Sequence, residues 1–171
     1  GEGIGKADGF TVFVKDASKK ITVTAKIMKA KKNYGYGRLM EILNASPYRV
    51  EPVCPSARQC GGCQLQAVSY EEQKVFKEKK LRGHLERIGG FTNLPMEPLI
   101  GMDEPYHYRN KAQFPVGRNK EGKIVTGFYA GRTHAIIENR DCALGIPENK
   151  DVLDPLRPDK SEPTRLRCIS Y

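Results

Sequence analysis

Residues 10–43 contain segments with the sequence pattern of β-strands. Residues 10–14 are rich in β-branched and aromatic side chains, and between 21 and 27 every odd position is apolar whereas every even position is polar. Period-two alternation places one apolar face on each strand. With a third strand expected at 36–43, short strands joined by Gly, Asp and Ser turns predict a small β-barrel, open or closed.

The glycines at positions 1, 3 and 5 resemble a dinucleotide-binding loop. Such a loop follows a strand, and no strand pattern precedes these glycines. We therefore interpret residues 1–5 as a turn of the barrel.

A helix is expected at 70–88, after a boundary marked by prolines at 47, 52 and 55. Ser69 and Glu72 have the spacing of a capping box, and Gly89 is suited to end the helix. The apolar residues that share one face at 100° per residue are Tyr70, Leu81, Leu85 and Ile88.

Strand patterns return after this helix. Apolar residues at 108, 112, 114 and 116 alternate with polar ones at 109, 111 and 113, and two further strands are expected at 124–130 and 134–138. The tail has prolines at 147, 155, 158 and 163 and no periodicity, which predicts irregular structure. The predicted fold class is mixed β and α/β: an OB-like N-terminal β-barrel at 1–50, an α+β domain with an antiparallel sheet at 54–145, and an irregular tail at 146–171.

Charge and composition limit the classes of partner that the protein could bind. The 171 residues carry a net charge of +9, which favours a polyanionic partner such as nucleic acid. No apolar run approaches the roughly 18 residues that span a bilayer, and the first residues have no signal-peptide pattern. We therefore expect a cytoplasmic protein with no membrane partner.

Three of the five cysteines lie within ten residues. Cys54, Cys60 and Cys63 form the pattern C-x5-C-G-G-C, and Cys142 follows much later. Three thiolates on one loop and a fourth supplied by the fold can hold tetrahedral zinc or an iron-sulfur cluster. Gly61 and Gly62 would let the loop wrap closely and direct N–H groups toward sulfur atoms. The weaker alternative is that these are ordinary buried cysteines. The spacing alone does not decide between zinc and an iron-sulfur cluster.

Several separated motifs carry a specific resemblance. They are CPSARQCGGCQLQAVSYEEQKVFKEKKL at 54–81, YRNKAQFPVG at 108–117, GFYAGRTHAII at 127–137 and RDC at 140–142. In this order they resemble the iron-sulfur-containing RNA (uracil-5-)-methyltransferases, in particular the bacterial 23S ribosomal RNA enzymes. The preceding GEGIGKADGFTVFV and KAKKNYGYGRLMEIL are similar to the TRAM domain, a small RNA-binding β-barrel at the N-terminus of those enzymes.

The resemblance implies a [4Fe-4S] cluster on Cys54, Cys60, Cys63 and Cys142, with zinc as the alternative metal and Cys168 outside the ligand set. In that family an S-adenosylmethionine-binding Rossmann-like domain carries out catalysis, using a cysteine that attacks C6 of uracil. We recognise no such domain in this chain. We therefore expect an N-terminal portion of a larger enzyme, monomeric and inactive alone, with no catalytic residues of its own.

The resemblance also nominates contacts to ribosomal RNA. Arg109, Lys111 and Gln113 would project from one strand face, where a fixed row of donors can pair with phosphates or bases. A solvated strand face is the alternative. Basic and aromatic residues of the N-terminal region form a second group, in which the tyrosines could instead pack on the barrel. Its members are Lys29, Lys31, Lys32, Tyr34 and Arg38, and Arg132 and His134 are further candidates.

Two classes of function remain. In the first, the parent protein methylates C5 of a uridine in 23S ribosomal RNA. In the second, the chain is a stand-alone RNA-binding or iron-sulfur electron-transfer module. A tRNA uracil-5 methyltransferase is a variant of the first class. The basic residues of the helix, between Lys74 and Arg82, are interpreted as its solvent face.

Overall fold

The computed structural model describes residues 2–156, 169 and 170. These residues divide into two compact units that are interleaved along the chain. We call residues 1–52 and 64–101 the sheet unit, and residues 53–63 and 102–171 the cysteine unit. The predicted domain limits 1–50, 54–145 and 146–171 stay a prediction, because the two units are defined by contacts in space and not by continuous segments of sequence.

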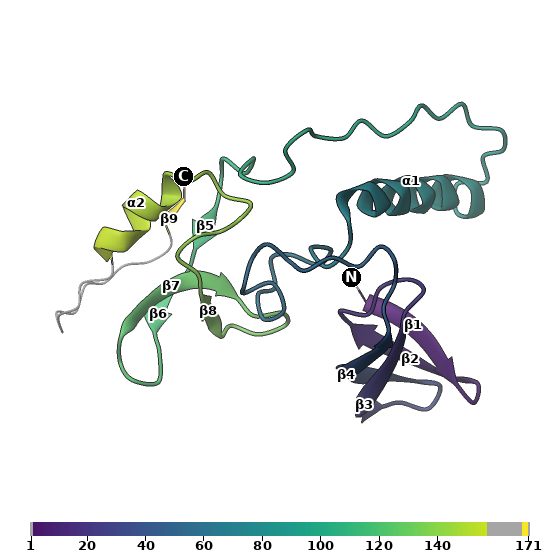
Figure 1. Cartoon of the computed structure of the whole chain (residues 1–171), viewed down its shortest axis with the longest axis horizontal. Helices are drawn as coiled ribbons and strands as arrows, with labels where there is room; N and C mark the ends of the chain where they lie inside the picture. The colour runs from purple at the N-terminus through teal and green to yellow at the C-terminus, as the bar shows by residue number, and fades with distance from the viewer. Residues whose placement is uncertain (1, 157–168, 171) are drawn as a thin grey trace. The chain divides into compact units, whose positions relative to one another are not determined.

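The sheet unit contains one four-stranded sheet (Figure 1). Its strands are β1 (Glu2–Ala7), β2 (Phe10–Lys15), β3 (Thr22–Ala30) and β4 (Tyr34–Asn44), in the spatial order β1-β2-β4-β3. β1 pairs with β2 and β3 with β4 in antiparallel fashion, whereas β2 and β4 run parallel. The three strands predicted from the sequence are thus confirmed with slightly different ends.

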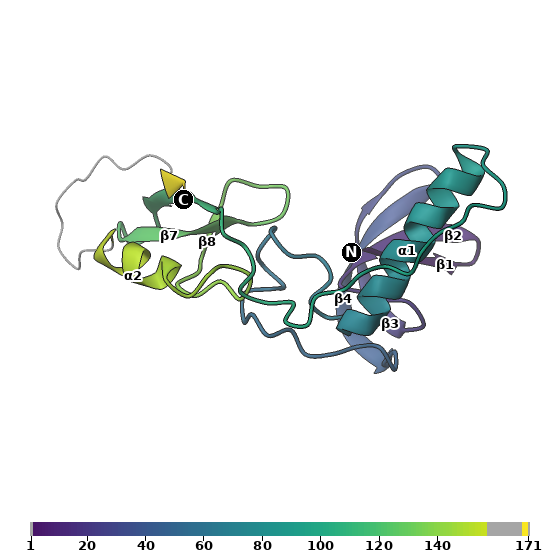
Figure 2. The same ribbon diagram turned by 90° about the horizontal axis from the view of Figure 1, so that it is seen from above.

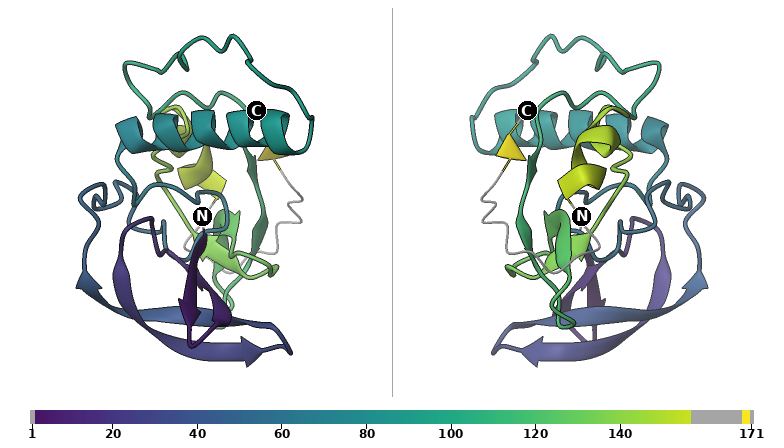
Figure 3. Two further views of the ribbon diagram at one scale, coloured as in Figure 1. Left: turned by 90° about the vertical axis from the view of Figure 1, so that its right-hand side faces the viewer. Right: turned by 90° about the vertical axis from the view of Figure 1, so that its left-hand side faces the viewer.

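The sheet is open rather than closed. β1 and β3 are its edges, so the described strands do not complete the closed form of the expected barrel. The β3–β4 ladder has register shifts between Thr22 and Val23, between Thr24 and Ala25, and between Ile27 and Lys29. Such bulges increase the local twist, and Figure 3 shows how strongly β3 and β4 curve.

The glycine-rich start of the chain is strand β1, not the turn that the sequence suggested. A Cβ added at Gly3 would lie 2.7 Å from the Cβ of Ala17. Glycine is therefore used at this position because another chain segment passes close by, a reason that a sequence pattern does not display.

The core of the sheet unit lies on one face of β2 and β4. Val12 and Val14 are buried, and a Cβ added at Gly37 would lie 3.2 Å from a methyl carbon of each. The apolar alternation predicted in β3 ends early, because Ile27 is 48% exposed and Met28 is 61% exposed after the strand bulges.

Helix α1 (Tyr70–Arg87) follows the sequence prediction closely. Ser69 caps it, since its Oγ accepts a hydrogen bond from the Glu72 N–H at 3.4 Å. The Ser69 N–H donates to the Tyr48 carbonyl at 2.8 Å, which ties the helix start to the segment after β4. No residue of α1 is buried, however, and Leu81 remains 52% exposed. The apolar arc predicted for this helix is therefore not a core face.

The cysteine unit contains shorter strands: β5 (Gln113–Phe114), β6 (Val116–Arg118), β7 (Ile124–Tyr129), β8 (Ile136–Glu138) and β9 (Ile169–Ser170). β6, β7 and β8 form an antiparallel sheet, and β5 pairs with β9. The continuous strand expected at 108–116 is wrong: residues 108–112 are irregular, and Pro115, which has no N–H for a ladder, separates β5 from β6.

The beginning of the tail is more ordered than its prolines suggested. Helix α2 (Asn149–Leu153) and a 3-10 turn (Asp154–Leu156) follow Pro147 (Figure 2). Leu153 is 2% exposed and lies in a core cluster with Ala112 and Phe114, against which Phe128 packs. Residues 157–168, and with them Cys168, lie outside the described part of the chain. No helix among the described residues is long and apolar enough to cross a membrane.

Candidate cysteine centre and nucleic-acid interface

The loop from Cys54 to Cys63 is built from consecutive tight turns. The Ala57 N–H donates to the Cys54 carbonyl at 3.0 Å, and the Cys60 N–H donates to the Ser56 carbonyl at 2.8 Å. These turns bury Cys54 and Cys60, each 6% exposed, whereas Cys63 and Cys142 are half-buried. All four predicted ligands belong to the cysteine unit and carry thiols rather than disulfides.

The two glycines of the loop have different roles. The Gly61 N–H donates to the Tyr129 carbonyl at 2.9 Å, and a Cβ at this position would lie 2.9 Å from the same oxygen and 3.0 Å from the Gly131 nitrogen. Gly61 thus allows the loop to lie against the end of β7. The Gly62 N–H instead donates to the Cys60 sulfur at 3.3 Å. The expected N–H to sulfur contact is therefore present at Gly62, whereas Gly61 pairs with backbone.

Asn139 connects the cysteine loop to the segment that carries Cys142. Its side chain is buried, its Nδ2 lies 3.8 Å from the Cys54 sulfur, and its Oδ1 accepts a hydrogen bond from the Asp141 N–H at 3.0 Å. Ala143, next to Cys142, packs in one cluster with Cys54. The sequence analysis missed Asn139, because no sequence pattern marks its contact with Cys54, 85 residues away.

The donor atoms suit a soft metal or cluster, because thiolates bind zinc and iron-sulfur clusters well. The structure does not display the ligand geometry, however. In residues 2–156, 169 and 170, no three or more His, Cys, Asp or Glu side chains are grouped as a metal site. The four-cysteine site therefore stays a prediction that rests on residue type, burial and the Gly62 contact.

Arg109, Lys111 and Gln113 are exposed, as predicted for a row of RNA contacts. Ala112 and Phe114 between them are 6% and 2% exposed, so the alternation holds from 111 to 114. The backbone of Arg109 is fixed by its neighbours rather than by a strand: its N–H donates to the Leu144 carbonyl at 2.7 Å, and it forms a bridge with Gly145.

Arg132 and His134 lie in the turn between β7 and β8. Arg132 is exposed and has a positive φ of 62°, as is typical of a tight turn. The His134 ring contacts the Tyr129 ring edge-on at 5.3 Å between centroids. His134 thus has a structural contact, as a lone histidine commonly does.

The basic and aromatic candidates of the sheet unit lie in β3, β4 and the turn between them. Lys31 and Lys32 are exposed in this turn, where the Lys31 N–H donates to the Tyr34 carbonyl at 2.7 Å. Tyr34 is 37% exposed and Arg38 is exposed on β4. Both tyrosines also pack on the sheet, as the alternative predicted, because the ring centroids of Tyr34 and Tyr36 each lie 5.8 Å from that of Phe13. Val12 and Val14 are buried on the opposite face.

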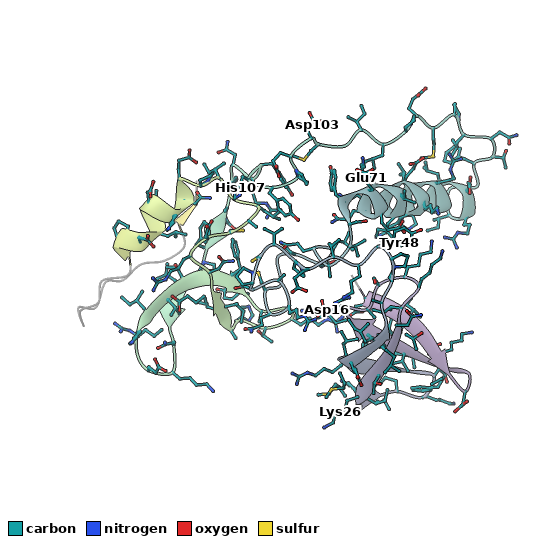
Figure 4. The ribbon with its side chains drawn as sticks, in the orientation of Figure 1. Asp16, Lys26, Tyr48, Glu71, Asp103 and His107 are labelled. Carbon is teal, nitrogen blue, oxygen red and sulfur yellow. The ribbon has the colours of Figure 1, made fainter. Side chains whose placement is uncertain are left out.

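The predicted solvent face of α1 is confirmed for Lys77, Lys79 and Lys80, which are exposed, whereas Lys74 and Arg82 are half-buried. Lys74 pairs with Glu71 at 2.8 Å, and Arg82 with Glu86 at 3.7 Å. Glu71 lies in the first turn of the helix (Figure 4). Intrahelical pairs of this kind are ordinary features of exposed helices.

Residues 1–40 match the family model of the TRAM domain. A protein of Halalkalibacterium halodurans named as an uncharacterized RNA methyltransferase is 46% identical over 153 residues, covering 90% of this chain and 33% of the relative. A protein of Clostridium acetobutylicum with the same description is 49% identical over 146 residues, covering 84% and 32%.

This chain spans about one third of the length of these relatives. Among solved structures, the Pyrococcus abyssi tRNA (uracil-54, C5)-methyltransferase in complex with S-adenosyl-L-homocysteine has a similar fold, with a TM-score of 0.58 and 22% identity. The alignment covers 91% of this chain and 35% of that protein. At this identity the likeness concerns the fold alone.

Proposed function

We propose that this chain is the RNA-binding portion of an S-adenosylmethionine-dependent enzyme that methylates C5 of a uridine in 23S ribosomal RNA. Two observations support the proposal: a relative named an RNA methyltransferase matches 90% of the chain, and the TRAM model matches its first 40 residues. The resemblance of the motifs around the cysteines and around Arg109 is our reason for proposing C5 of uridine and 23S ribosomal RNA as the target. A monomeric cytoplasmic enzyme is the form that we propose.

The chemical steps belong to a part of the enzyme other than the described residues. In the family that the sequence resembles, a cysteine thiolate adds to C6 of uracil, C5 takes the methyl group from S-adenosylmethionine, and a base removes the C5 proton. A cofactor site of this kind is built on a βαβ unit. Within the described residues no helix joins two parallel strands, so we assign RNA binding and positioning to this chain.

Cys54, Cys60, Cys63 and Cys142 would hold a [4Fe-4S] cluster, with zinc as the alternative and Cys168 outside the set. Bound there, the cluster would cross-link the cysteine loop to the Cys142 segment. The Asn139 side chain already bridges the same two segments in the protein. The Gly62 N–H would remain a donor to the Cys60 sulfur, and such contacts tune metal thiolates.

A transfer RNA is the second candidate substrate, because the protein of similar fold acts on tRNA according to its title. The chain's own motifs favour ribosomal RNA, whereas that likeness has only 22% identity. A comparison of the two RNAs distinguishes the candidates.

A binding experiment tests the RNA-binding role. Labelled stem-loop RNA with unpaired uridines is titrated with the chain, with Arg109→Ala/Lys111→Ala and, as a matched control, with Lys77→Ala/Lys80→Ala. All four side chains are exposed, but the backbone of Arg109 is held by hydrogen bonds to Leu144 and Ile146, whereas Lys77 and Lys80 lie on α1. We expect the first variant to bind more weakly than the control. The affinity should also fall as the salt concentration rises, because each contacted phosphate releases about 0.7 counterion. Equal affinities would remove the Arg109 region from the interface.

A further inference from the structure

Three aromatic rings gather on the sheet face that does not form the core. β2 and β4 run parallel with Phe13 opposite Tyr36, and Tyr34 lies two residues before Tyr36. Side chains two residues apart on a strand share a face, so these rings lie opposite the face of Val12 and Val14. Each pair of ring centroids is 5.8 Å apart.

Two of the rings have similar orientations, and the third is nearly perpendicular to both. The planes of Phe13 and Tyr36 differ by only 35°, whereas Tyr34 stands at 90° to Phe13 and 87° to Tyr36. The Phe13 and Tyr36 rings are therefore similarly inclined, with Tyr34 at the side, and both residues are half-buried. Tyr34 is 37% exposed, and Ile4, opposite Phe13 on β1, is 69% exposed.

Basic residues border these rings. On β3, Lys29 is the register partner of Tyr36 and Lys26 is the partner of Arg38. Cross-strand partners share a face, and all three basic side chains are exposed. Lys26 is labelled in Figure 4. We call Phe13, Tyr34, Tyr36, Lys26, Lys29 and Arg38 the aromatic face.

The sequence YGYGR at 34–38 explains how one strand serves two purposes. Its glycines alternate with the large residues, and both Gly35 and Gly37 are buried on the core side. A Cβ at Gly37 would lie 3.2 Å from side-chain carbons of Val12 and Val14. Close packing on the glycine side leaves Tyr34, Tyr36 and Arg38 on the other side, where they contribute no core.

We propose that the aromatic face is a stacking platform for unpaired bases of single-stranded RNA, with Lys26, Lys29 and Arg38 contacting the flanking phosphates. The proposal rests on the proposed function, from which it takes RNA as the partner. Aromatic rings beside positive charges suit a strand whose bases can leave their own stack, whereas bases in a duplex are already stacked. An apolar protein partner would not match the three basic side chains.

The chain contains no tryptophan, so Tyr36→Trp would introduce a single fluorescent reporter into the aromatic face. Three RNA probes are titrated: a twelve-residue oligouridine, an abasic strand with the same number of phosphates, and a fully paired duplex. We expect oligouridine to quench the tryptophan emission and the other two to leave it nearly unchanged. Equal quenching by the abasic strand would overturn the stacking proposal, because phosphates alone would then explain the signal.

Substitutions measure the contribution of stacking. Phe13→Leu/Tyr36→Leu keeps apolar side chains but removes both ring surfaces, and it should weaken oligouridine binding about fivefold or more. Affinity for the abasic strand should not change. Tyr36→Phe keeps a ring and should bind normally, as should the control Leu43→Ala, whose side chain is 61% exposed on the same strand.

The outcomes separate this proposal from the proposed function. If the double leucine variant binds oligouridine normally while Arg109→Ala/Lys111→Ala binds weakly, the platform is wrong and RNA binding stands. If the unmodified chain binds neither oligouridine nor stem-loop RNA, the proposed function fails and the platform fails with it. Circular dichroism checks that each variant is folded; should the double variant unfold, the quenching by oligouridine decides.

Discussion

The sheet unit and the cysteine unit differ in the length of their strands and in how their segments are paired. Strands of six, six, nine and eleven residues pair along most of their length in the sheet unit. The described strands of the cysteine unit have two to six residues, and single bridges, such as that between Cys60 and Ala130, connect its loops. The first unit depends on repeated local pairing and the second on a few long-range contacts.

Among the described residues, the cysteine unit has two core clusters, one of which contains the large buried side chains Phe114 and Leu153. The cluster around Cys54 consists of Cys54, Ala57 and Ala143, with Tyr106 packed against it. Side chains of this size bury little apolar surface, and small units with small cores usually depend on a metal or disulfide cross-link. The loop around Cys54 should therefore depend on its thiols, whereas the Phe114 cluster and the four-stranded sheet should not.

Removal of a proposed ligand should have the largest effect. In a chain purified without oxygen, we expect iron and sulfide in cluster-like ratio, and Cys142→Ser should lose the metal and the cooperative unfolding of the loop around Cys54. Cys168→Ser is the control and should keep both. Metal analysis and circular dichroism provide the measurements.

Two results would contradict this expectation. Stoichiometric zinc without sulfide in the anaerobic sample excludes the cluster. Equal metal loss in both serine variants would contradict the assignment of Cys142, and not Cys168, as the fourth ligand.

Leu153→Ala should have the next largest effect. Leu153 is 2% exposed beside Ala112 and Phe114, and truncation of a buried leucine costs about 2–5 kcal/mol. Leu43→Ala, at a side chain that is 61% exposed, should change stability by less than about 0.5 kcal/mol. Urea unfolding of both variants checks the pair; equal small changes would mean that α2 does not contribute to the core.

The CGGC glycines allow a finer test of the cysteine loop. A Cβ at Gly61 would approach the Tyr129 carbonyl and the Gly131 backbone, whereas the nearest atom to a Cβ at Gly62 is the Cys60 sulfur at 3.4 Å. Gly61→Ala should therefore destabilise the cysteine unit by about 1–3 kcal/mol, as overpacking does. Gly62→Ala should cost clearly less. Thermal unfolding monitored by circular dichroism compares them, and the reverse order would refute the loop geometry.

The smallest effect is expected at the start of α1. Ser69→Ala removes the Oγ that accepts from the Glu72 N–H, at a cost of about 1 kcal/mol. Ser69→Asp keeps an acceptor and should restore stability. Chemical unfolding of the two variants is the measurement; a Ser69→Ala variant as stable as the unmodified chain would show that the cap is unimportant.

Local features of the fold could be predicted from the sequence. The capping box placed α1 within one residue of its observed limits, and period-two alternation located β2, β3 and β4. Features that depend on distant contacts could not. Position 3 of β1 needs glycine because Ala17 lies close to it. The parallel pairing of β2 with β4 joins two strands that β3 separates in the sequence.

The candidate site shows the same division. The exposure of Arg109, Lys111 and Gln113 was predicted from the sequence and is confirmed, whereas the four-cysteine ligand set stays a prediction. Asn139 was missed because its role depends on a contact with Cys54, which is far away in the chain. Phe13 was missed because only the register of β2 against β4 brings it beside Tyr36.

The most direct test of the account is methyl transfer to RNA. A longer protein that includes this chain is incubated with S-adenosylmethionine carrying a labelled methyl group and with 23S ribosomal RNA or tRNA, and the 171-residue chain alone is the control. The account predicts label on C5 of uridine in 23S ribosomal RNA, and no label with tRNA or with the control. Methylation of tRNA alone, label on another atom, or methyl transfer by the control would contradict it.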